Sequence, residues 1–395
     1  MIALPLLLAQ AFALKDGDVV LFYGDSITEQ RLYTTYVETF VRTRFPKLDA
    51  EFITVGVGGD ATWGGWAGDA ATRVERDVKP FQPTRIVIML GMNDGGYVPY
   101  DAKIEQIFVD WYRKLLGYMR SAAPKAKLTL VQTSPFDDFT KRPSPFAGYN
   151  ATLLKLGKNI VELSRQEGAD FVDFNAPFVA AMSRASNPEA FLPDMIHPGP
   201  PGHLVMASVL LKDWHAPSTV ADVALDAREH KVVRADNTLV TGFDGLRWTQ
   251  KDNALPFPLD ESTRPGADAI GFQTDLNRQM LMVTGLEAGR YSLSIDGQTV
   301  SVFSDMQLAA GVNLADYDTP MLRQATQVLD LITKRNEVFF LWWQRMGCVM
   351  NGFSGTQEVI AALKKLEKSI AKEARSAALP LSHRYELSPV KEASE

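Results

Sequence analysis

Residues 22–30 read FYGDSITEQ and place a Gly-Asp-Ser sequence directly after an apolar segment. The residues from Asp18 to Tyr23 have the β-branched and aromatic composition of a strand. The residues that follow space their apolar side chains at helical intervals, so Ser26 is predicted on a tight turn between a strand and a helix. Two interpretations of Ser26 remain open. Either it caps the helix, a role that Thr28 can also fill, or the turn presents its hydroxyl as a nucleophile beside the helix N-terminus.

The composition is that of a globular chain with room for more than one domain. Of its 395 residues, 46% are hydrophobic, and the formal net charge of -6 is spread over interspersed acidic and basic residues. Such a pattern lacks the basic stripe of nucleic-acid-binding proteins and the polybasic segment that binds anionic lipid. The only cysteine, Cys348, excludes an intrachain disulfide and a cysteine-ligated zinc cluster. We therefore expect no nucleic acid partner, no metal and no other cofactor.

The N-terminus has features of an export signal. Residues 1–14 are largely apolar, and Ala11-Phe12-Ala13 forms a small-residue cleavage pattern before the first charge, Lys15. The segment is short and lacks a basic n-region, so a packed or irregular terminus is the alternative interpretation. Neither this segment nor the aromatic run at residues 338–350 is long enough to span a bilayer. We expect a signal peptide over residues 1–13, hence a periplasmic or secreted protein without stable membrane insertion.

Residues 14–216 alternate predicted strands with predicted helices. The strands are expected near residues 18–24, 50–58, 84–91, 126–133 and 169–175, and the helices near residues 29–45, 70–79, 102–123, 147–167 and 176–185. This alternation predicts an α/β fold, with a parallel sheet that carries helices on both faces. Ligands of such sheets bind beyond the carboxyl ends of the strands.

Three further segments are predicted after residue 216. Residues 217–305 carry short alternating segments and a hairpin signal at Asp296-Gly297, so they are expected to form a β-rich unit. Residues 306–377 follow a helical pattern. Residues 378–395 are expected to form a loosely held tail.

Polar blocks stand where the expected strands end. The first three loops contain Asp25-Ser26, Gly58-Gly59-Asp60 and Gly91-Met92-Asn93-Asp94, and Asp194 precedes His197 by three residues in a proline-bounded loop before an apolar helix. Each block taken alone is typical of an ordinary turn. A lone histidine is also more often structural than catalytic, and His203 on the following helix is expected to be structural.

The blocks GDS, GGD, GMND and DMIHP, in this order, resemble those of the SGNH hydrolases, also called GDSL esterases or lipases. The resemblance covers about the first 215 residues and departs at GDSI, where the family has Gly-Asp-Ser-Leu. It implies a flavodoxin-like three-layer sandwich with a parallel five-stranded sheet. It further implies that Ser26 is the nucleophile, His197 the general base and Asp194 its orienting acid, with Ser26, Gly59 and Asn93 forming the oxyanion hole. Gly58 differs from Gly59 in this role only by register.

These residue types also suit ester hydrolysis on chemical grounds. A serine hydroxyl becomes a nucleophile when a neutral imidazole removes its proton, and a carboxylate holds that imidazole in the required tautomer. Backbone N–H groups and a side-chain amide stabilise the oxyanion. The Gly-x-Ser-x-Gly elbow of α/β-hydrolases and the His-Glu-x-x-His motif of zincins are both absent from the sequence.

The sequence indicates the type of reaction more narrowly than the substrate, because the family that it resembles includes carbohydrate deacetylases, lipases, thioesterases and arylesterases. Trp63, Trp66 and Tyr97 are expected to contact substrate, the indoles by stacking on sugar rings, although packing is the commoner role of tryptophan. The cleft loops contain no run of Leu, Ile or Val for a long acyl chain. We expect an esterase that removes short acyl groups such as acetyl from a carbohydrate or small-molecule ester. A lipid or aryl esterase and a catalytically silent carbohydrate-binding protein are the alternatives, and no oligomeric state is predicted.

Overall fold

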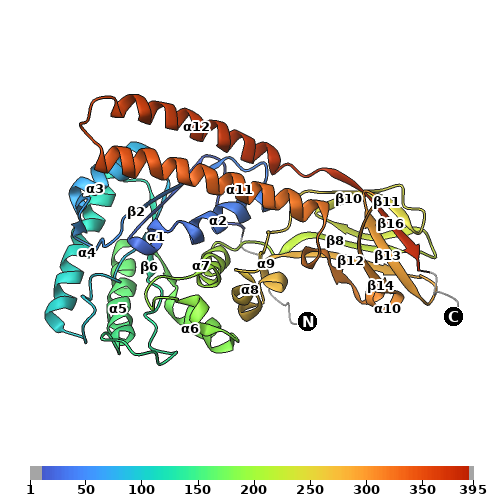
Figure 1. Ribbon diagram of the computed structural model, residues 1–395, viewed down its shortest axis with the longest axis horizontal. Coiled ribbons are helices and arrows are strands. Elements are labelled where there is room, and N and C mark those ends of the chain that lie inside the picture. Colours follow the sequence, from blue (N-terminus) through green and yellow to red (C-terminus); the bar gives the residue numbers. More distant parts are fainter. Residues whose placement is uncertain (1–10, 391–395) are drawn as a thin grey trace, which may run out of the picture.

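Five segments rich in Val, Ile, Leu and Phe pair side by side in the computed structural model, which describes residues 11–390 (Figure 1). The strand order is β2-β1-β5-β6-β7, and every pair is parallel. The strands are β1 (Asp18–Gly24), β2 (Ala50–Gly56), β5 (Arg85–Met89), β6 (Lys127–Gln132) and β7 (Asp170–Asp173). The predicted α/β sandwich with a parallel five-stranded sheet in flavodoxin-like order is confirmed.

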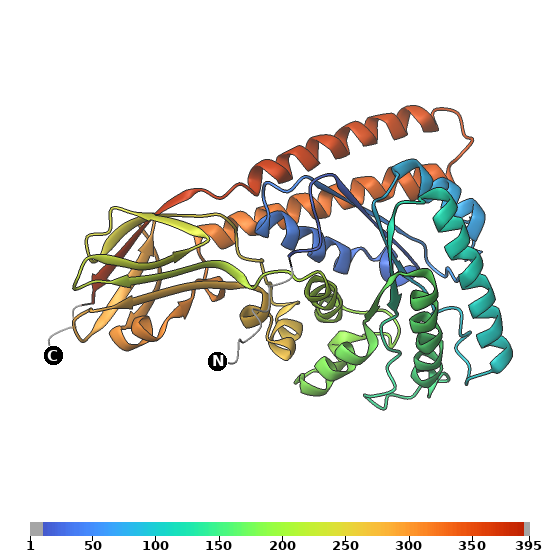
Figure 2. The ribbon, with the colours of Figure 1, turned by 180° about the vertical axis from the view of Figure 1, so that it is seen from behind.

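Helices cover both faces of this sheet and complete three layers, as the front and rear views show (Figures 1 and 2). Val20 and Phe22 of β1 pack toward α2 and α7, whereas Leu21 and Tyr23 pack toward α3 and α4. A central parallel strand is apolar on both faces for this reason. The helices are α1 (Ser26–Glu29), α2 (Leu32–Arg44), α3 (Ala70–Asp77), α4 (Ala102–Ala122), α5 (Tyr149–Glu167), α6 (Asn175–Arg184) and α7 (Pro200–Asp213).

The helix expected over residues 29–45 begins earlier and is broken. Helix α1 starts at Ser26, and Arg31 adopts a left-handed backbone with φ of 63° before α2 begins at Leu32. This break separates the turn that carries Ser26 from the long helix packed on the sheet.

The N-terminal segment from residue 11 onward packs on the α/β domain. The first ten residues of the predicted signal segment lie outside the described residues. Phe12 stacks on Phe45 with ring centroids 4.3 Å apart, and the Ala13 N–H donates to the Trp214 carbonyl at 2.9 Å.

Two further sheets face each other at the other end of the molecule. One has the order β10-β11-β16-β13-β14 and the other β15-β12-β8-β9, and their inner faces share one apolar core. The strands are β8 (Thr219–Asp226), β9 (Lys231–Asp236), β10 (Thr238–Thr241), β11 (Arg247–Asp252), β12 (Arg278–Thr284), β13 (Arg290–Ile295), β14 (Gln298–Ser304), β15 (Val312–Asn313) and β16 (Ser382–Pro389). The hairpin predicted at Asp296-Gly297 joins β13 to β14, and both turn residues have positive φ, as a type I′ turn requires.

The expectation of a loosely held C-terminal tail is wrong for residues 382–389. Strand β16 lies in the middle of the five-stranded sheet, between β11 and β13. His383, Tyr385 and Leu387 are buried in alternation with more exposed neighbours. The segment is therefore structural, because its apolar side chains complete the core of the sandwich.

One stretch within the expected β-rich unit belongs to the core of the first domain. Between β11 and β12 the chain forms α8 (Arg264–Ile270) and α9 (Phe272–Leu276). Phe257, Phe272 and Leu276 of this stretch share a core with α2 and α7. The sandwich is thus anchored to the α/β domain by its own sequence.

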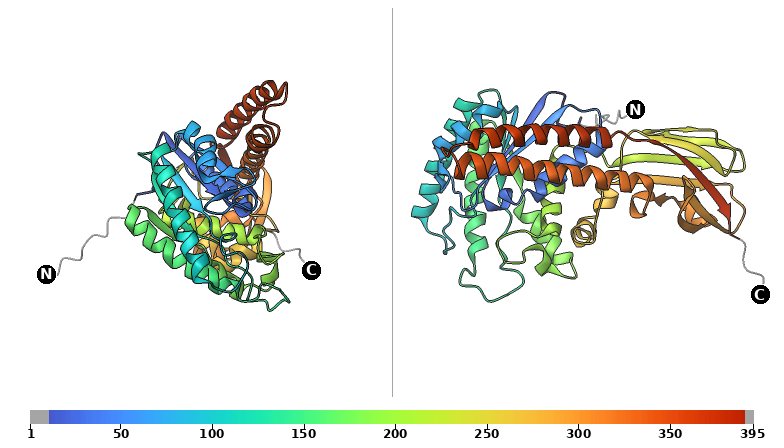
Figure 3. Two further views of the ribbon diagram at one scale, coloured as in Figure 1. Left: turned by 90° about the vertical axis from the view of Figure 1, so that its left-hand side faces the viewer. Right: turned by 45° about the horizontal axis from the view of Figure 1, so that its top comes forward.

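Two long helices lie side by side across both parts of the molecule (Figure 3). Helix α11 (Pro320–Phe340) runs into a π-helical segment (Leu341–Val349), and α12 (Thr356–Ala377) returns toward β16. On α11, Arg335 pairs with Glu38 of α2 at 2.8 Å and donates to the Phe52 carbonyl at 2.9 Å. Over residues 11–390, no helix combines the length and apolarity needed to cross a membrane.

Candidate active site

Three of the polar loops meet because their strands end in register. Gly24, the last residue of β1, pairs with Gly56 of β2 and with Met89 of β5. The loops after these strands therefore leave the same edge of the sheet together. They carry Ser26, Gly59 and Asn93, as the sequence predicts for a site at the carboxyl ends of parallel strands.

The structure brings Ser26, His197 and Asp194 into one hydrogen-bonded chain. The distance between Ser26 Oγ and His197 Nε2 is 2.8 Å, and that between His197 Nδ1 and Asp194 Oδ2 is 2.7 Å. The Asp194 side chain is 55% exposed and that of His197 is 34% exposed, so these two residues of the triad lie at the protein surface. In this arrangement the imidazole can take a proton from Ser26 while Asp194 fixes the tautomer.

The loop from Asp194 to His197 is held in a constrained conformation. Met195 has φ of 73°, and Asp194 Oδ1 accepts from the backbone N–H groups of Ile196 at 3.0 Å and His197 at 2.6 Å. A non-glycine residue in the left-handed region is uncommon and often marks a functional loop. Partial burial acts to raise the pKa of Asp194, but the hydrogen bonds from His197 and Ile196 outweigh it and leave that pKa below its ordinary value. The carboxylate is thus kept ionised beside the imidazole.

The second loop is a Gly-Gly turn next to Ser26. The Asp60 N–H donates to the Val57 carbonyl at 3.1 Å, and Gly59 in the third position has φ of 78°, which is the pattern of a type II turn. A Cβ placed on Gly58 would lie 3.9 Å from Ser26 Cβ. Within residues 11–390, neither the Ser26 N–H nor the Gly59 N–H has a hydrogen-bond acceptor, so both are free to bind an oxyanion.

The Asn93 amide reaches this turn from the third loop. Its Nδ2 donates to the Asp60 carbonyl at 2.8 Å, and its Oδ1 accepts from the Tyr97 hydroxyl at 3.0 Å. A carboxamide nitrogen carries two hydrogens, so one remains for a ligand.

A fully buried ion-pair network lies beneath the second loop. Arg73 of α3 binds the carboxylate of Asp60, pairs with Asp77 at 2.9 Å and donates to the Val55 carbonyl at 2.5 Å. Its guanidinium also lies 4.5 Å from the centroid of the Tyr23 ring. A buried arginine with these partners fixes the position of Asp60, whose carbonyl in turn holds Asn93.

Two more aspartates of the sequence blocks are buried. Asp25 accepts from the Ile27 N–H at 3.0 Å and caps α1, and Asp94 accepts from the Thr62 N–H at 2.8 Å and its hydroxyl at 2.7 Å. Each has a second carboxylate oxygen without a partner in the described part of the chain. Burial raises the pKa of Asp25 to about 7 and that of Asp94 to about 6.

The three residues expected to contact substrate lie around these loops. Trp63 is 37% exposed and Trp66 57% exposed. Trp66 Nε1 donates to the Gly58 carbonyl at 3.1 Å, and Tyr97 contacts Asn93 as described above. His203 is buried and bonded to Gln30 at 2.8 Å, and burial lowers its pKa to about 3, which fits its expected structural role.

Helices α11 and α12 with the π-helical segment between them form a C-terminal helical hairpin, which contributes contacts that the sequence analysis missed. Gln344 in the π-helical segment is fully buried and donates to Glu29, three residues after Ser26, at 2.6 Å. Trp343 donates to Asp77. In the sequence, Gln344 stands out as an amide inside the apolar run LWWQRM, but the sequence does not show that it is buried or which group it binds.

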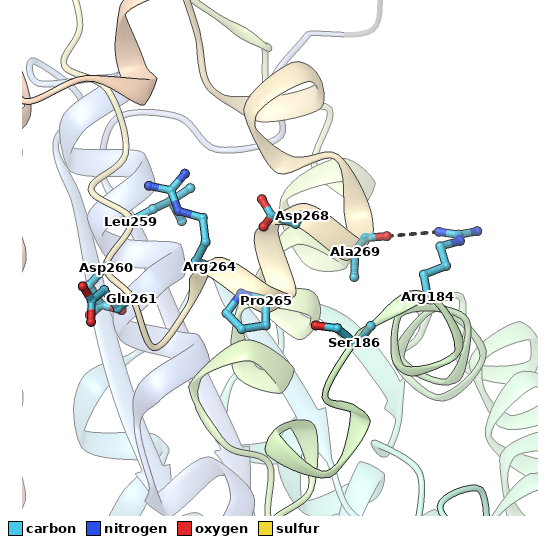
Figure 4. A pocket seen from close by; sticks show the side chains of 10 residues that line it. Arg184, Ser186, Leu259, Asp260, Glu261, Arg264, Pro265, Asp268 and Ala269 are labelled. Carbon is cyan, nitrogen blue, oxygen red and sulfur yellow. Dashed lines mark hydrogen bonds between the residues drawn. The ribbon is translucent and has the colours of Figure 1, made fainter.

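The cavity drawn in Figure 4 is separate from these residues. It has a volume of about 810 Å³ and lies between the end of α6 and α8, with Arg184, Asp260, Arg264 and Asp268 in its wall. None of the triad residues, Gly59 or Asn93 lines it.

Comparisons with known proteins find similar sequences over the α/β domain. The family model for the GDSL-like lipase/acylhydrolase family matches residues 22–205. An acetylxylan esterase of Geobacillus stearothermophilus is 25% identical over 216 residues, which make up 50% of this chain and 94% of that protein.

Among solved structures, a gut microbial diltiazem-metabolizing enzyme is similar over nearly the whole chain. It has a TM-score of 0.82 and 23% identity and covers 95% of this chain and 98% of its own. The two proteins therefore share the fold, including the sandwich and the helical hairpin. A crystal structure of an acetylxylan esterase from Geobacillus stearothermophilus has a TM-score of 0.43 and 22% identity and covers 51% of this chain and 96% of its own.

Proposed function

We propose that this chain, which through residues 22–205 belongs to the GDSL-like lipase/acylhydrolase family and is an ester-hydrolysing serine hydrolase, removes acetyl groups from a carbohydrate. The observation that carries the mechanism is the 2.8 Å contact between Ser26 Oγ and His197 Nε2. It pairs a nucleophile with a base at hydrogen-bonding distance.

In the first half of the reaction Ser26 Oγ attacks the acyl carbon and gives its proton to His197 Nε2. The imidazolium is stabilised by Asp194 through the 2.7 Å contact at Nδ1. The carbonyl oxygen gains the negative charge, and the N–H groups of Ser26 and Gly59 with the Asn93 amide bind it. When the intermediate collapses, the ester bond breaks and the sugar hydroxyl leaves with the proton from His197.

The second half returns the enzyme to its starting state. A water molecule gives one proton to His197 and attacks the acyl group on Ser26 with its oxygen. The same donors bind the second oxyanion, the bond to Ser26 Oγ breaks, and His197 returns the proton to that oxygen. The products are acetate and the free hydroxyl of the carbohydrate, and no cofactor takes part.

Three features support a carbohydrate acetate as substrate. The acetylxylan esterase of Geobacillus stearothermophilus is similar to this chain over its α/β domain. Trp63 and Trp66 follow the Gly-Gly turn in the same loop and have exposed indoles, that of Trp66 bonded to the Gly58 carbonyl, and such surfaces stack on sugar rings. A long acyl chain gains about 0.8 kcal/mol per buried methylene, and the loops GDATWGGWAGD, GMNDGGYVPYD and SPFDDFTKRPSP contain no aliphatic run to bind one.

The test compares acetate release from acetylated xylo-oligosaccharides with hydrolysis of p-nitrophenyl esters of increasing chain length. We expect acetate release, and kcat/KM that is highest for acetyl or propionyl and falls steeply by octanoyl. Values that rise toward palmitoyl would instead favour a lipid esterase. Binding of the oligosaccharides without any turnover would favour a catalytically silent binding protein.

A further inference from the structure

The two amides that supply oxyanion donors each accept a hydrogen bond from an aromatic side chain at their carbonyl end. Trp66 Nε1 donates to the Gly58 carbonyl at 3.1 Å, and the Tyr97 hydroxyl donates to Asn93 Oδ1 at 3.0 Å. Both aromatic residues come from the same loops as the amides they contact. The Gly59 N–H and the Asn93 amide thus share one arrangement, in which an aromatic side chain donates to the oxygen of the amide that supplies the oxyanion donor.

At the first donor, the contact controls the orientation of a single planar group. The Gly58 carbonyl and the Gly59 N–H belong to one peptide unit and point in opposite directions. This peptide is the central one of the turn between Val57 and Asp60, and it is rotated by about half a turn between type I and type II turns. With glycine on both sides, no Cβ opposes that rotation. The Trp66 bond holds the carbonyl on one side and so keeps the Gly59 N–H on the other.

At the second donor, the Tyr97 contact acts together with the Asp60 carbonyl to fix which end of the carboxamide faces the site. Rotating the Asn93 side chain by half a turn would exchange Nδ2 with Oδ1 and present an acceptor to the oxyanion. The Asp60 carbonyl can only accept, so its 2.8 Å bond keeps Nδ2 in its present place, and the Tyr97 hydroxyl holds Oδ1 at the other end of the group by donating to it at 3.0 Å. Together the two bonds leave the second N–H of Asn93 free for the ligand.

Both contacts also strengthen the donors they orient. An amide that accepts a hydrogen bond at its oxygen is polarised, and its N–H groups become better donors. This effect counts most when full negative charge develops on the substrate oxygen, in the transition state. Loss of either contact should therefore lower kcat more than it changes KM.

We propose that Trp66 and Tyr97 are positioning residues of the oxyanion hole, acting through the Gly58–Gly59 peptide and the Asn93 amide. This role rests on the proposed esterase function and adds to any contact that the exposed indole face makes with substrate. A stacking role alone needs the ring, whereas the positioning role needs the N–H or the hydroxyl.

The test uses Tyr97→Phe, which removes only the hydroxyl, and Trp66→Phe, which removes the indole N–H and keeps an aromatic ring of smaller size. The matched controls are Trp111→Phe on α4, outside the loops of the site, whose indole N–H has no acceptor within residues 11–390, and Tyr100→Phe, whose hydroxyl binds Glu105. Trp66 is 57% exposed and Phe is isosteric with Tyr apart from the hydroxyl, so both proteins are expected to fold. Circular dichroism checks this.

Hydrolysis of p-nitrophenyl acetate should show kcat reduced about fivefold to tenfold in each variant, the effect of losing one hydrogen bond, with KM within about twofold of wild type. The double variant should lose about the product of the two factors, and the controls should match wild type. Folded Trp66→Phe and Tyr97→Phe proteins with wild-type kcat, or with raised KM alone, would overturn the positioning role while leaving the esterase intact. A wild-type protein that hydrolyses no ester would overturn the proposed function, and the positioning role with it.

Discussion

The indole N–H of Trp343 donates a 2.9 Å hydrogen bond to Asp77, a residue 266 positions earlier in the chain. Asp77 also pairs with Arg73, which binds the Asp60 carboxylate under the Gly-Gly turn. All three charged residues are fully buried. The C-terminal helical hairpin thus supports the loop that carries one of the oxyanion donors.

Replacing Trp343 by Phe should destabilise the protein without removing the active site. The lost hydrogen bond to a buried carboxylate is expected to cost about 1 to 3 kcal/mol, because part of the desolvation of Asp77 is no longer offset. The melting temperature measures this loss. Trp342→Phe, which removes a bond to Glu367 of α12 rather than to the α/β domain, is the matched control. A Trp343→Phe protein as stable as wild type would contradict the supporting role of the hairpin.

The Asn93→Ala variant should lose kcat by about a hundredfold or more with a smaller change in KM. Removing one oxyanion donor acts mainly on the transition state. Steady-state kinetics with p-nitrophenyl acetate measure both constants, and Asn159→Ala on α5 serves as control because its amide binds Glu105 away from the site. An unchanged kcat with a raised KM would make Asn93 a substrate contact instead.

The buried carboxyl group of Asp25 predicts a pH-dependent stability. Burial raises its pKa to about 7 in the folded protein, whereas an unfolded aspartate titrates near 3.9. Between about pH 4 and pH 7 the folded state therefore holds a proton that the unfolded state has lost. The contribution of Asp25 to the free energy of unfolding is complete below about pH 4 and is lost as the pH rises through about 7.

Asp25→Asn removes this titration and keeps an oxygen for the Ile27 N–H. The free energy of unfolding of the variant minus that of the wild type should rise by about 2 to 4 kcal/mol from pH 4 to pH 8. Urea unfolding at both pH values gives the difference, and Asp236→Asn at an exposed site is the control. An equal effect of Asp25→Asn at the two pH values would refute the raised pKa.

The local patterns of the sequence were enough to predict the α/β fold. The spacing of apolar residues along the chain indicates which segments form buried strands and which form helices. The family resemblance assigned the triad roles to Ser26, Asp194 and His197, and the distances between these residues in the structure suit those roles. The contacts of Trp343 and Gln344 were not predictable in the same way. They join residues that are 266 and 315 positions apart in the chain, and no local periodicity encodes such a contact.

The C-terminal strand was missed although its sequence alternates. In SHRYELSP every second residue from His383 to Leu387 is buried, but polar residues separate them and a long helix precedes the segment. Its partners, β11 and β13, lie far upstream in the chain. Only the assembled sheet shows that this segment fills a central position.

Tyr385→Ala should therefore destabilise the sandwich strongly. The ring is buried and stacks on Trp248 with centroids 5.0 Å apart, and truncation of a buried aromatic costs about 3 to 5 kcal/mol. Ser388→Ala at an exposed position of the same strand is the control. Melting curves of the two variants that coincide with wild type would mean that residues 382–389 do behave as a loose tail.

The most direct test of the central claim is labelling with a fluorophosphonate, followed by mass spectrometry of the peptides. We predict a single adduct on Ser26 in the wild-type protein and none in Ser26→Ala, whose ester hydrolysis should fall by several orders of magnitude while its circular dichroism is unchanged. Ser186→Ala, at the cavity of Figure 4, should be labelled and active like wild type. A folded Ser26→Ala protein that retains wild-type kcat/KM, or an adduct on another serine, would contradict the assignment of Ser26 as the nucleophile.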